Sequence, residues 1–201
     1  LQPILEQNLL LTRLVDDLRT LALVDSGELK LEVSSVDLPV LVERLVERFR
    51  PQAAQNQITL LVTSRIPSSS LRTVHVDPFR MDQILNNLLS NALRYTPTGG
   101  QIETMIESDG RQVRVSVHDS GPGIPLESLP HVFERFYRAD RSRSRSEGGT
   151  GLGLAIARKL AEAQAGSLAA ENHPNGGAIF TLQLPLSADN PPAVQNSGTG
   201  S

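Results

Sequence analysis

The residues that follow Asp77-Pro78 place the strongest constraint on the fold of this 201-residue chain. Aspartate is a favoured N-cap and proline is favoured at the first helical position, so a helix is expected to begin here. Apolar side chains recur with helical spacing on one face, at Met81, Ile84, Leu85, Leu88, Leu89 and Ala92. Polar side chains form a second stripe, at offsets of four, four and three: Gln83, Asn87, Asn91 and Arg94. The helix therefore offers one face to a core and another to polar chemistry.

The segments around this helix predict an α/β fold. Strand patterns occur at residues 58–62, 74–76, 101–107, 112–119, 167–171 and 178–184, and helical patterns at residues 38–54 and 152–165. A further short strand pattern follows Glu28, and Asp109-Gly110 predicts the turn of a hairpin. Mixed hairpins and helices favour one mixed sheet covered on one face by helices.

The first 27 residues predict a helical appendage to this α/β domain. Apolar residues stand at heptad-like spacing and form a seam that seeks partner helices: Ile4, Leu11, Leu14, Leu18 and Leu21. Asp25-Ser26-Gly27 is expected to end the helix, with Gly27 as the C-cap. We therefore expect an appendage at residues 1–27 and a domain at residues 28–186. The tail at residues 187–201 is rich in Pro, Asn, Gly and Ser and is expected to be disordered.

Composition and charge exclude several classes of function. The net charge of −3 gives no basic footprint, so no nucleic acid partner is expected. The absence of cysteine excludes disulfides and thiolate chemistry. No apolar run reaches the roughly 20 residues that cross a bilayer, and no signal peptide is visible. We expect a soluble, cytoplasmic chain and, because it opens on Leu1, a fragment of a longer protein.

Three polar or glycine-rich features suggest chemistry. The amide oxygens of Asn87 and Asn91 suit Mg²⁺, which takes its other ligands from water and phosphate, although two asparagines alone fit a solvated helix face better. Asp119 ends an apolar strand and could accept the exocyclic amine of adenine, although an ordinary turn explains it equally well. Gly148-Gly149-Thr150-Gly151-Leu152-Gly153 leads into a helix, where free N–H groups bind phosphates. A flexible hinge is the alternative for that segment.

The remaining features carry less chemistry. The Arg/Ser-rich stretch at residues 138–149 is poor in core-forming residues and is expected to be a mobile loop. RNA binding is the alternative for this stretch, and it is disfavoured because only Tyr137 supplies an aromatic ring. None of the four histidines has metal-ligand spacing. The glycine-rich segment is neither a P-loop nor a dinucleotide fingerprint.

Four of these segments, in this order, resemble the catalytic and ATP-binding domain of bacterial two-component sensor histidine kinases. DQILNNLLSNALRYTP resembles the N box, DSGPGIP the G1 box, VFERFYRAD the F box and GGTGLGLAIARKL the G2 box. NGGAIFTLQLP resembles the terminal glycine-strand motif, and the resemblance covers about residues 29–186. It implies a Bergerat-type two-layer α/β sandwich, with a mixed sheet and helices on one face. ATP would lie between the N-box helix and a mobile lid at about residues 138–150.

The resemblance also implies roles for individual residues. Asn91 would bind Mg²⁺ with help from Asn87, and Arg94 would contact phosphate where relatives often carry Lys. The adenine would be contacted by Tyr95, Asp119, Gly121, Gly123 and Ile124, with Thr181 beneath it. The F box would close on the nucleotide through Tyr137 and Arg138, and the phosphates would be wrapped by Gly149, Thr150, Gly151, Leu152 and Gly153.

The N-terminal helix resembles the second helix of the family's dimerisation and phosphoacceptor hairpin. The first helix, with its histidine followed by an acidic residue, has no counterpart here, and the only His-acidic pair, His118-Asp119, belongs to the adenine site. The resemblance therefore implies transfer of the γ-phosphoryl group of Mg·ATP to a histidine absent from this chain, for relay to a response-regulator aspartate. The implied full-length kinase is a membrane-anchored homodimer whose phosphoacceptor domain is the partner of this one.

Two alternatives to a kinase remain at this stage. The gyrase-like and chaperone-like ATPases share the fold and hydrolyse ATP with a Glu one turn before the metal Asn. Asn87 stands at that position and cannot act as a general base. A degenerate nucleotide-binding module that only dimerises is the other alternative, and the intact Asn91, Asp119 and glycine motifs disfavour it.

Overall fold

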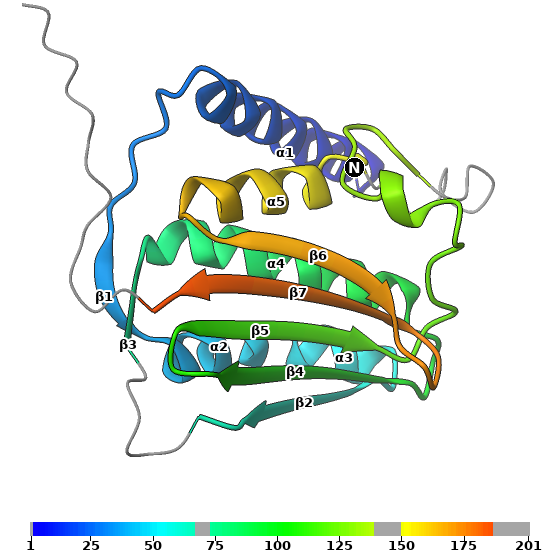
Figure 1. Ribbon diagram of the computed structural model, residues 1–201. Coiled ribbons are helices and arrows are strands. Elements are labelled where there is room, and N and C mark those ends of the chain that lie inside the picture. The colour runs from blue at the N-terminus through cyan, green and yellow to red at the C-terminus, as the bar shows by residue number, and fades with distance from the viewer. Residues whose placement is uncertain (1, 67–72, 139–149, 187–201) are drawn as a thin grey trace, which may run out of the picture.

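The computed structural model describes residues 2–66, 73–138 and 150–186, which form a mixed α/β structure (Figure 1). The helices are α1 (Gln2–Asp25), α2 (Leu38–Glu47), α3 (Arg50–Gln55), α4 (Pro78–Tyr95), the short 3₁₀ helix η1 (Leu129–His131) and α5 (Gly153–Ala163). The strands are β1 (Ser34–Asp37), β2 (Thr59–Ser64), β3 (Thr73–Val76), β4 (Gln101–Ser108), β5 (Gln112–Asp119), β6 (Ser167–Asn172) and β7 (Ala178–Pro185). The strands and helices agree with the sequence-based expectations except at the points described below.

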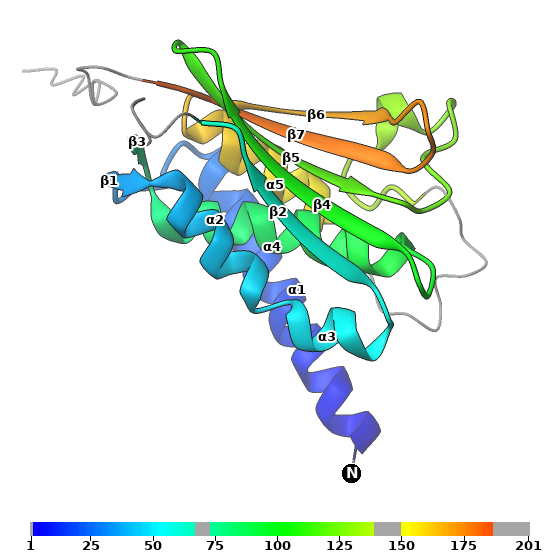
Figure 2. The same cartoon turned by 90° about the horizontal axis from the view of Figure 1, so that it is seen from below.

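Five strands form the main sheet in the order β2-β4-β5-β7-β6, and β1 pairs with β3 in a separate two-stranded sheet. β2 runs parallel to β4, whereas the other neighbours in the main sheet are antiparallel. Figure 2 shows α2, α3, α4 and α5 on the same face of this sheet. The mixed sheet with helices on one face is therefore confirmed.

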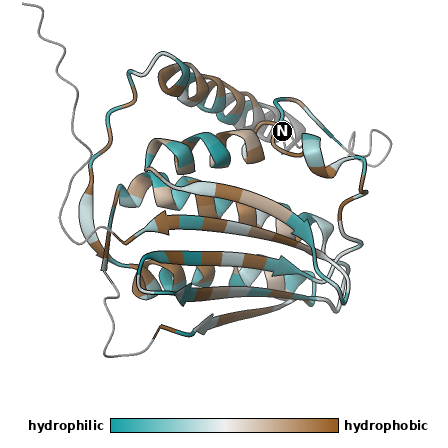
Figure 3. Ribbon diagram, in the orientation of Figure 1, coloured by the Kyte–Doolittle hydropathy of each residue, from teal (hydrophilic) through white to brown (hydrophobic). Residues whose placement is uncertain are grey.

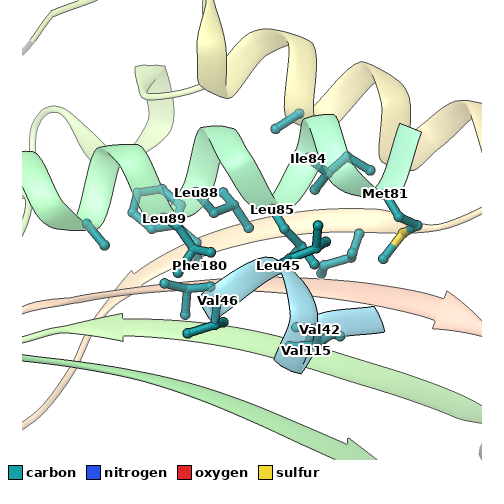
Figure 4. Close-up of a cluster of buried hydrophobic side chains, with 14 of the residues drawn as sticks. Val42, Leu45, Val46, Met81, Ile84, Leu85, Leu88, Leu89, Val115 and Phe180 are labelled. Carbon is teal, nitrogen blue, oxygen red and sulfur yellow. The ribbon is translucent and has the colours of Figure 1, made fainter. Parts of the chain in front are cut away.

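The core lies between this sheet and its helices. Alternate residues of β5 are buried, namely Val113, Val115, Val117 and Asp119, as expected for a strand with one covered face. Figure 3 shows the same alternation of apolar and polar residues along the strands. In Figure 4, side chains of α2 and α4 meet Phe180 of β7, and Leu85, Leu88 and Phe180 are almost completely buried. Each such side chain stabilises the fold by roughly 1.5–3 kcal/mol, so α4 is fixed firmly on the sheet.

Two predicted elements have different bounds in the structure. The expected helix at residues 38–54 is divided into α2 and α3, because Pro51 has no N–H for a helix that continues from Glu47. Pro51 instead lies in the first turn of α3, where proline is tolerated. The strand expected from Glu28 begins only at Ser34, where pairing with β3 starts.

Helix α1 packs beside α5, and its apolar seam is divided between two faces (Figure 1). Leu14 and Leu21, seven residues apart, pack against the core of the domain. Leu11 and Leu18, also seven residues apart, are 58% and 49% exposed. Two of the four seam residues whose side chains are described therefore cover the domain itself. The boundary near residue 28 stays a prediction. The side chain of Ile4 and the predicted tail lie outside the described residues, and no described helix is long and apolar enough to span a membrane.

Asp77 joins three segments at the start of α4. Its Oδ1 accepts the N–H groups of Phe79 (2.9 Å) and Arg80 (3.1 Å), which confirms the predicted N-cap. Its Oδ2 accepts the N–H of Glu32 at 3.0 Å, and its own N–H donates to Gln164 Oε1 at 2.8 Å. The buried Asp77 therefore ties the linker after α1 to α4 through its carboxylate and the end of α5 to α4 through its backbone N–H.

We predict that Asp77→Ala lowers the free energy of unfolding by about 2–3 kcal/mol, because three backbone N–H groups lose their acceptor. Asp37→Ala is the matched control, since Asp37 is an exposed N-cap that accepts from Val40 N at 3.2 Å. That variant should lose about 1 kcal/mol or less. Urea titration of both variants measures the difference, and equal losses would contradict the role of Asp77.

Candidate functional site

The polar stripe of α4 faces the start of α5. Gln83, Asn87, Asn91 and Arg94 are all partly buried. A Cβ atom added at Gly153 would lie 3.0 Å from Asn87 Oδ1, so the bare glycine lets the first residue of α5 approach the stripe. Asn91 follows one helical turn later on the same face of α4. The structure therefore brings Asn87 to the glycine-rich segment, and Asn91 lies one turn along the same helix.

The backbone before α5 leaves N–H groups at a helix N-terminus without a side-chain cap. Gly151 has a φ of +72°, and a Cβ atom there would lie 2.9 Å from Phe136 Cα. The Phe136 N–H donates to Gly151 O at 2.9 Å, and Leu152 N–H donates to Thr150 Oγ1 at 3.2 Å. No side chain caps the N-terminus of α5, and its first turn holds no acidic residue. Its N–H groups and positive dipole end can therefore meet a phosphate.

Asp119 lies at the other end of the site, where β5 ends. Its side chain is buried, and Oδ1 accepts the N–H groups of Gly121 (2.9 Å) and Ala178 (3.4 Å). Burial raises the pKa of this carboxyl above its ordinary value, while the two backbone N–H groups and the neighbouring His118 act in the opposite direction. Both bonds use Oδ1, so the second carboxylate oxygen has the capacity to accept an N–H from a ligand.

The loop after Asp119 lies against the end of α4. A Cβ atom at Gly121 would lie 2.6 Å from the carbonyl oxygen of Tyr95, the last residue of α4. The Tyr95 side chain is 50% exposed, and Ile124 packs partly buried against the core. Gly123 has a φ of +78°, which favours glycine at this turn. Tyr95, Asp119, Gly121, Gly123 and Ile124 therefore lie along one short path, as predicted.

The residues predicted for the lid are only partly described. Tyr137 Oη donates to the buried Ser128 Oγ at 3.0 Å, and Arg138 is partly buried. Gly149 and most of the predicted lid lie outside the described residues.

Thr181 is not brought to this site. Phe180 faces the helices, so its neighbour Thr181 faces the uncovered side of the sheet, where its Oγ1 lies 3.2 Å from Ser116 Oγ. The residue of β7 that reaches Asp119 is Ala178, through its backbone N–H. Sequence reasoning missed Ala178 because the donor is its backbone N–H, which almost every residue type has.

The histidines differ in part from the expectations. The His118 ring stacks on His173 with 4.2 Å between centroids, and His118 Nε2 lies 3.2 Å from Gly176 O. His131 was expected to lack an acidic neighbour, which is wrong: its Nδ1 lies 2.7 Å from Glu134 Oε1. The pair is three residues apart, so a search for adjacent His-acidic residues could not find it.

The side chains present fit a nucleotide with a hard cation better than a metal site built from protein ligands alone. Among the described residues, no group of three His, Cys, Asp or Glu side chains could hold a metal ion. Mg²⁺ needs only one or two protein oxygens when phosphates and water supply the others. The amide oxygen of Asn87, beside the start of α5, could supply one such ligand, and Asn91 on the next turn of α4 could supply another.

Comparison with known proteins agrees with this geometry. The family model described as histidine kinase-, DNA gyrase B-, and HSP90-like ATPase matches residues 76–188. The signal transduction histidine-protein kinase BaeS of Escherichia coli K12 is 41% identical over 179 residues, which are 89% of this chain and 38% of BaeS. The chain therefore spans less than two fifths of that relative.

Two solved structures extend the comparison. Full-length ShkA in complex with AMPPNP has a TM-score of 0.76 at 30% identity, covering 90% of this chain and 37% of ShkA. Histidine kinase ThkA in complex with the response regulator protein TrrA has a TM-score of 0.69 at 28% identity, covering 88% of this chain and 48% of ThkA. These matches confirm the fold class and the family resemblance carried by the four boxes.

The raised pKa of Asp119 should affect how the stability of the ligand-free chain depends on pH. A carboxyl whose pKa is higher in the folded state destabilises the fold as the pH rises above its unfolded pKa, near 3.8. Asp119→Asn removes this charge and keeps the Oδ1 acceptor, so the variant should be as stable as the parent at low pH and more stable at pH 7. Urea unfolding between pH 4 and 8 measures the difference.

Asp109→Asn is the control with the opposite sign. Asp109 is exposed, and the N–H groups of Arg111 and Gln112 lower its pKa, so its charge stabilises the fold above the unfolded pKa and this contribution is lost as the pH falls. Asp109→Asn should therefore lose stability at pH 7. A loss of the same size in Asp119→Asn would contradict the cost of burying the Asp119 charge.

Proposed function

The chain belongs to the family of histidine kinase-, DNA gyrase B- and HSP90-like ATPases, and we propose that it is the catalytic, Mg·ATP-binding part of a protein-histidine kinase. The observation that carries the proposal is the arrangement along α4. Asn87 meets the glycine-rich start of α5, while Tyr95 at the end of the same helix contacts the loop that follows Asp119. One helix would therefore line both the site for the phosphates and the cation and the site for the adenine ring.

At the phosphate end, the residues bind and orient the triphosphate. The N–H groups at the start of α5 would hold phosphate oxygens, and Arg94 would add a positive charge from the polar stripe of α4. Asn91, with Asn87, would hold Mg²⁺, which when bound neutralises negative charge that develops on the phosphoryl group. At the other end, the Asp119 carboxylate would accept the exocyclic amine of adenine, beside Tyr95 and Ile124.

Transfer to a histidine is favoured over hydrolysis because the site has an amide where a base would be needed. Asn87 can coordinate or donate a hydrogen bond, but it cannot remove a proton from water. The nearest described acidic residue on the same helix, Asp82, pairs with Arg48 at 2.7 Å. The chain would therefore act by positioning the γ-phosphoryl group for an acceptor histidine on a phosphoacceptor helix.

The relay partner would be a response regulator, whose aspartate receives the phosphoryl group. The solved ThkA structure contains such a protein, and the relatives are named as sensor or signal transduction histidine kinases. For this chain, the response regulator, the dimeric full-length kinase and a membrane anchor are parts of the proposal. The exposed Leu11 and Leu18 on α1 support a helical partner for that part of the chain.

Two substitutions test the site from its two ends. Asn91→Ala should abolish Mg²⁺-dependent phosphoryl transfer and keep most of the nucleotide affinity measured without Mg²⁺.

Asp119→Asn should lower the affinity for ATP by roughly 5- to 150-fold, since it places a donor opposite the adenine amine at a cost of about 1–3 kcal/mol. Calorimetry measures the affinities, and parental values for Asp119→Asn would remove the adenine assignment.

A labelling experiment tests the reaction itself. Incubated with γ-labelled ATP, this chain should bind Mg·ATP without labelling itself, and an added phosphoacceptor domain should acquire acid-labile label. His131→Ala is included because His131, held by Glu134, is the described histidine with an acidic side-chain partner. Label on this chain that disappears in His131→Ala would show that the acceptor is internal. Binding of Mg·ATP with no transfer to any phosphoacceptor would favour a degenerate binding module.

A further inference from the structure

The side chain of Asn172, the last residue of β6, forms hydrogen bonds to the backbone of the loop after Asp119. Its Oδ1 accepts the N–H of Ile124 at 2.7 Å, and its Nδ2 donates to the carbonyl oxygen of Ile124 at 2.7 Å. A primary amide is the side-chain group that offers a donor and an acceptor side by side in this way. Asn172 therefore satisfies both backbone groups of one residue that lies 48 positions away in the sequence.

The same turn also fixes Asp119. Asn172 is paired in register with Ala178, whose N–H donates to Asp119 Oδ1. Between them, Gly177 has a φ of +86° and lies so close to Asp119 that a Cβ atom would overlap its carbonyl oxygen. On the other side, a Cβ atom at Gly123 would lie 2.9 Å from Asn172 Oδ1. The β6–β7 turn therefore touches both ends of the loop that runs from Asp119 to Ile124.

We propose that Asn172 is a positioning residue for the adenine end of the nucleotide site. The loop between Asp119 and Ile124 contains Gly121 and Gly123, whose backbones have wide conformational freedom. The two hydrogen bonds from Asn172 remove this freedom at Ile124, and Ala178 fixes Asp119 from the same turn. Asn172 thereby sets the distance between the Asp119 carboxylate, which would accept the adenine amine, and the apolar side chain of Ile124. The inference rests on the proposed binding of ATP at this site.

The first test is Asn172→Ala in this chain, with ATP as the probe. The affinity for ATP should fall roughly 5- to 10-fold, because ATP would then have to order a loop that Asn172 no longer holds. The thermal midpoint without nucleotide should stay close to that of the parent, because Asn172 is exposed and water can replace its bonds. Asn175→Ala, an exposed asparagine in the same turn, is the matched control and should bind ATP like the parent. In the full-length kinase, Asn172→Ala should raise KM for ATP and leave kcat unchanged.

A double-mutant cycle with Ile124→Ala separates positioning from a general effect. If Asn172 acts by placing Ile124, Asn172→Ala should cost much less than 5-fold in affinity once the Ile124 side chain is removed. An equal loss in both backgrounds, or a fall in stability without a fall in ATP affinity, would overturn the proposal. Parental affinity in Asn172→Ala would overturn it as well. If the parent chain itself did not bind ATP, the proposed function would fail instead. The affinity of the parent chain therefore distinguishes the two failures.

Discussion

The close approach of Asn87 to Gly153 is the contact on which the arrangement of the site depends. The first residue of α5 can approach the polar stripe of α4 only because it carries no side chain, as a Cβ atom there would lie 3.0 Å from Asn87 Oδ1. The opposite face of α4 is buried against the sheet, so α4 cannot move away to make room. The apolar face of the helix therefore fixes how its polar face meets the glycine-rich segment.

The same helix determines the spacing of the site. Asn87 and Tyr95 are eight residues apart, which corresponds to roughly 12 Å along a helix axis. Tyr95 contacts the loop after Asp119 through the space left by Gly121. The cation and phosphate end and the base end are thus positioned on one rigid element, while the loops that complete each end come from β5, the β6–β7 turn and the start of α5. The separation of the two ends is therefore set by α4 and not by the loops.

Most of the fold and of the site could be predicted from the sequence, because periodicity and glycine spacing are local signals. The alternation in β5 and the Asp77-Pro78 start of α4 are examples, and both were confirmed. The sequence could not show the contacts that depend on strand register, such as Ala178 on Asp119 or Asn172 on Ile124. It also misplaced Thr181, because a motif position does not state which face of β7 a side chain occupies. A heptad pattern likewise could not show that Leu14 and Leu21 of the α1 seam pack on the domain.

The docking of α1 links that helix to the segment that precedes α5. Asp25 forms an ion pair with Arg135 at 2.6 Å. Burial raises the pKa of the Asp17 carboxyl, and the Thr150 hydroxyl acts on that pKa in the opposite direction. An exposed ion pair contributes only about 0–1 kcal/mol, whereas the buried Leu21 contributes roughly 1.5–3 kcal/mol, so apolar packing holds α1 and the polar contacts orient it. Arg135 lies next to Phe136, whose φ of +62° is rare for a residue with a side chain and whose N–H donates to Gly151. Because α1 contacts residues on both sides of this strained junction, its orientation and the geometry of the phosphate end are not independent.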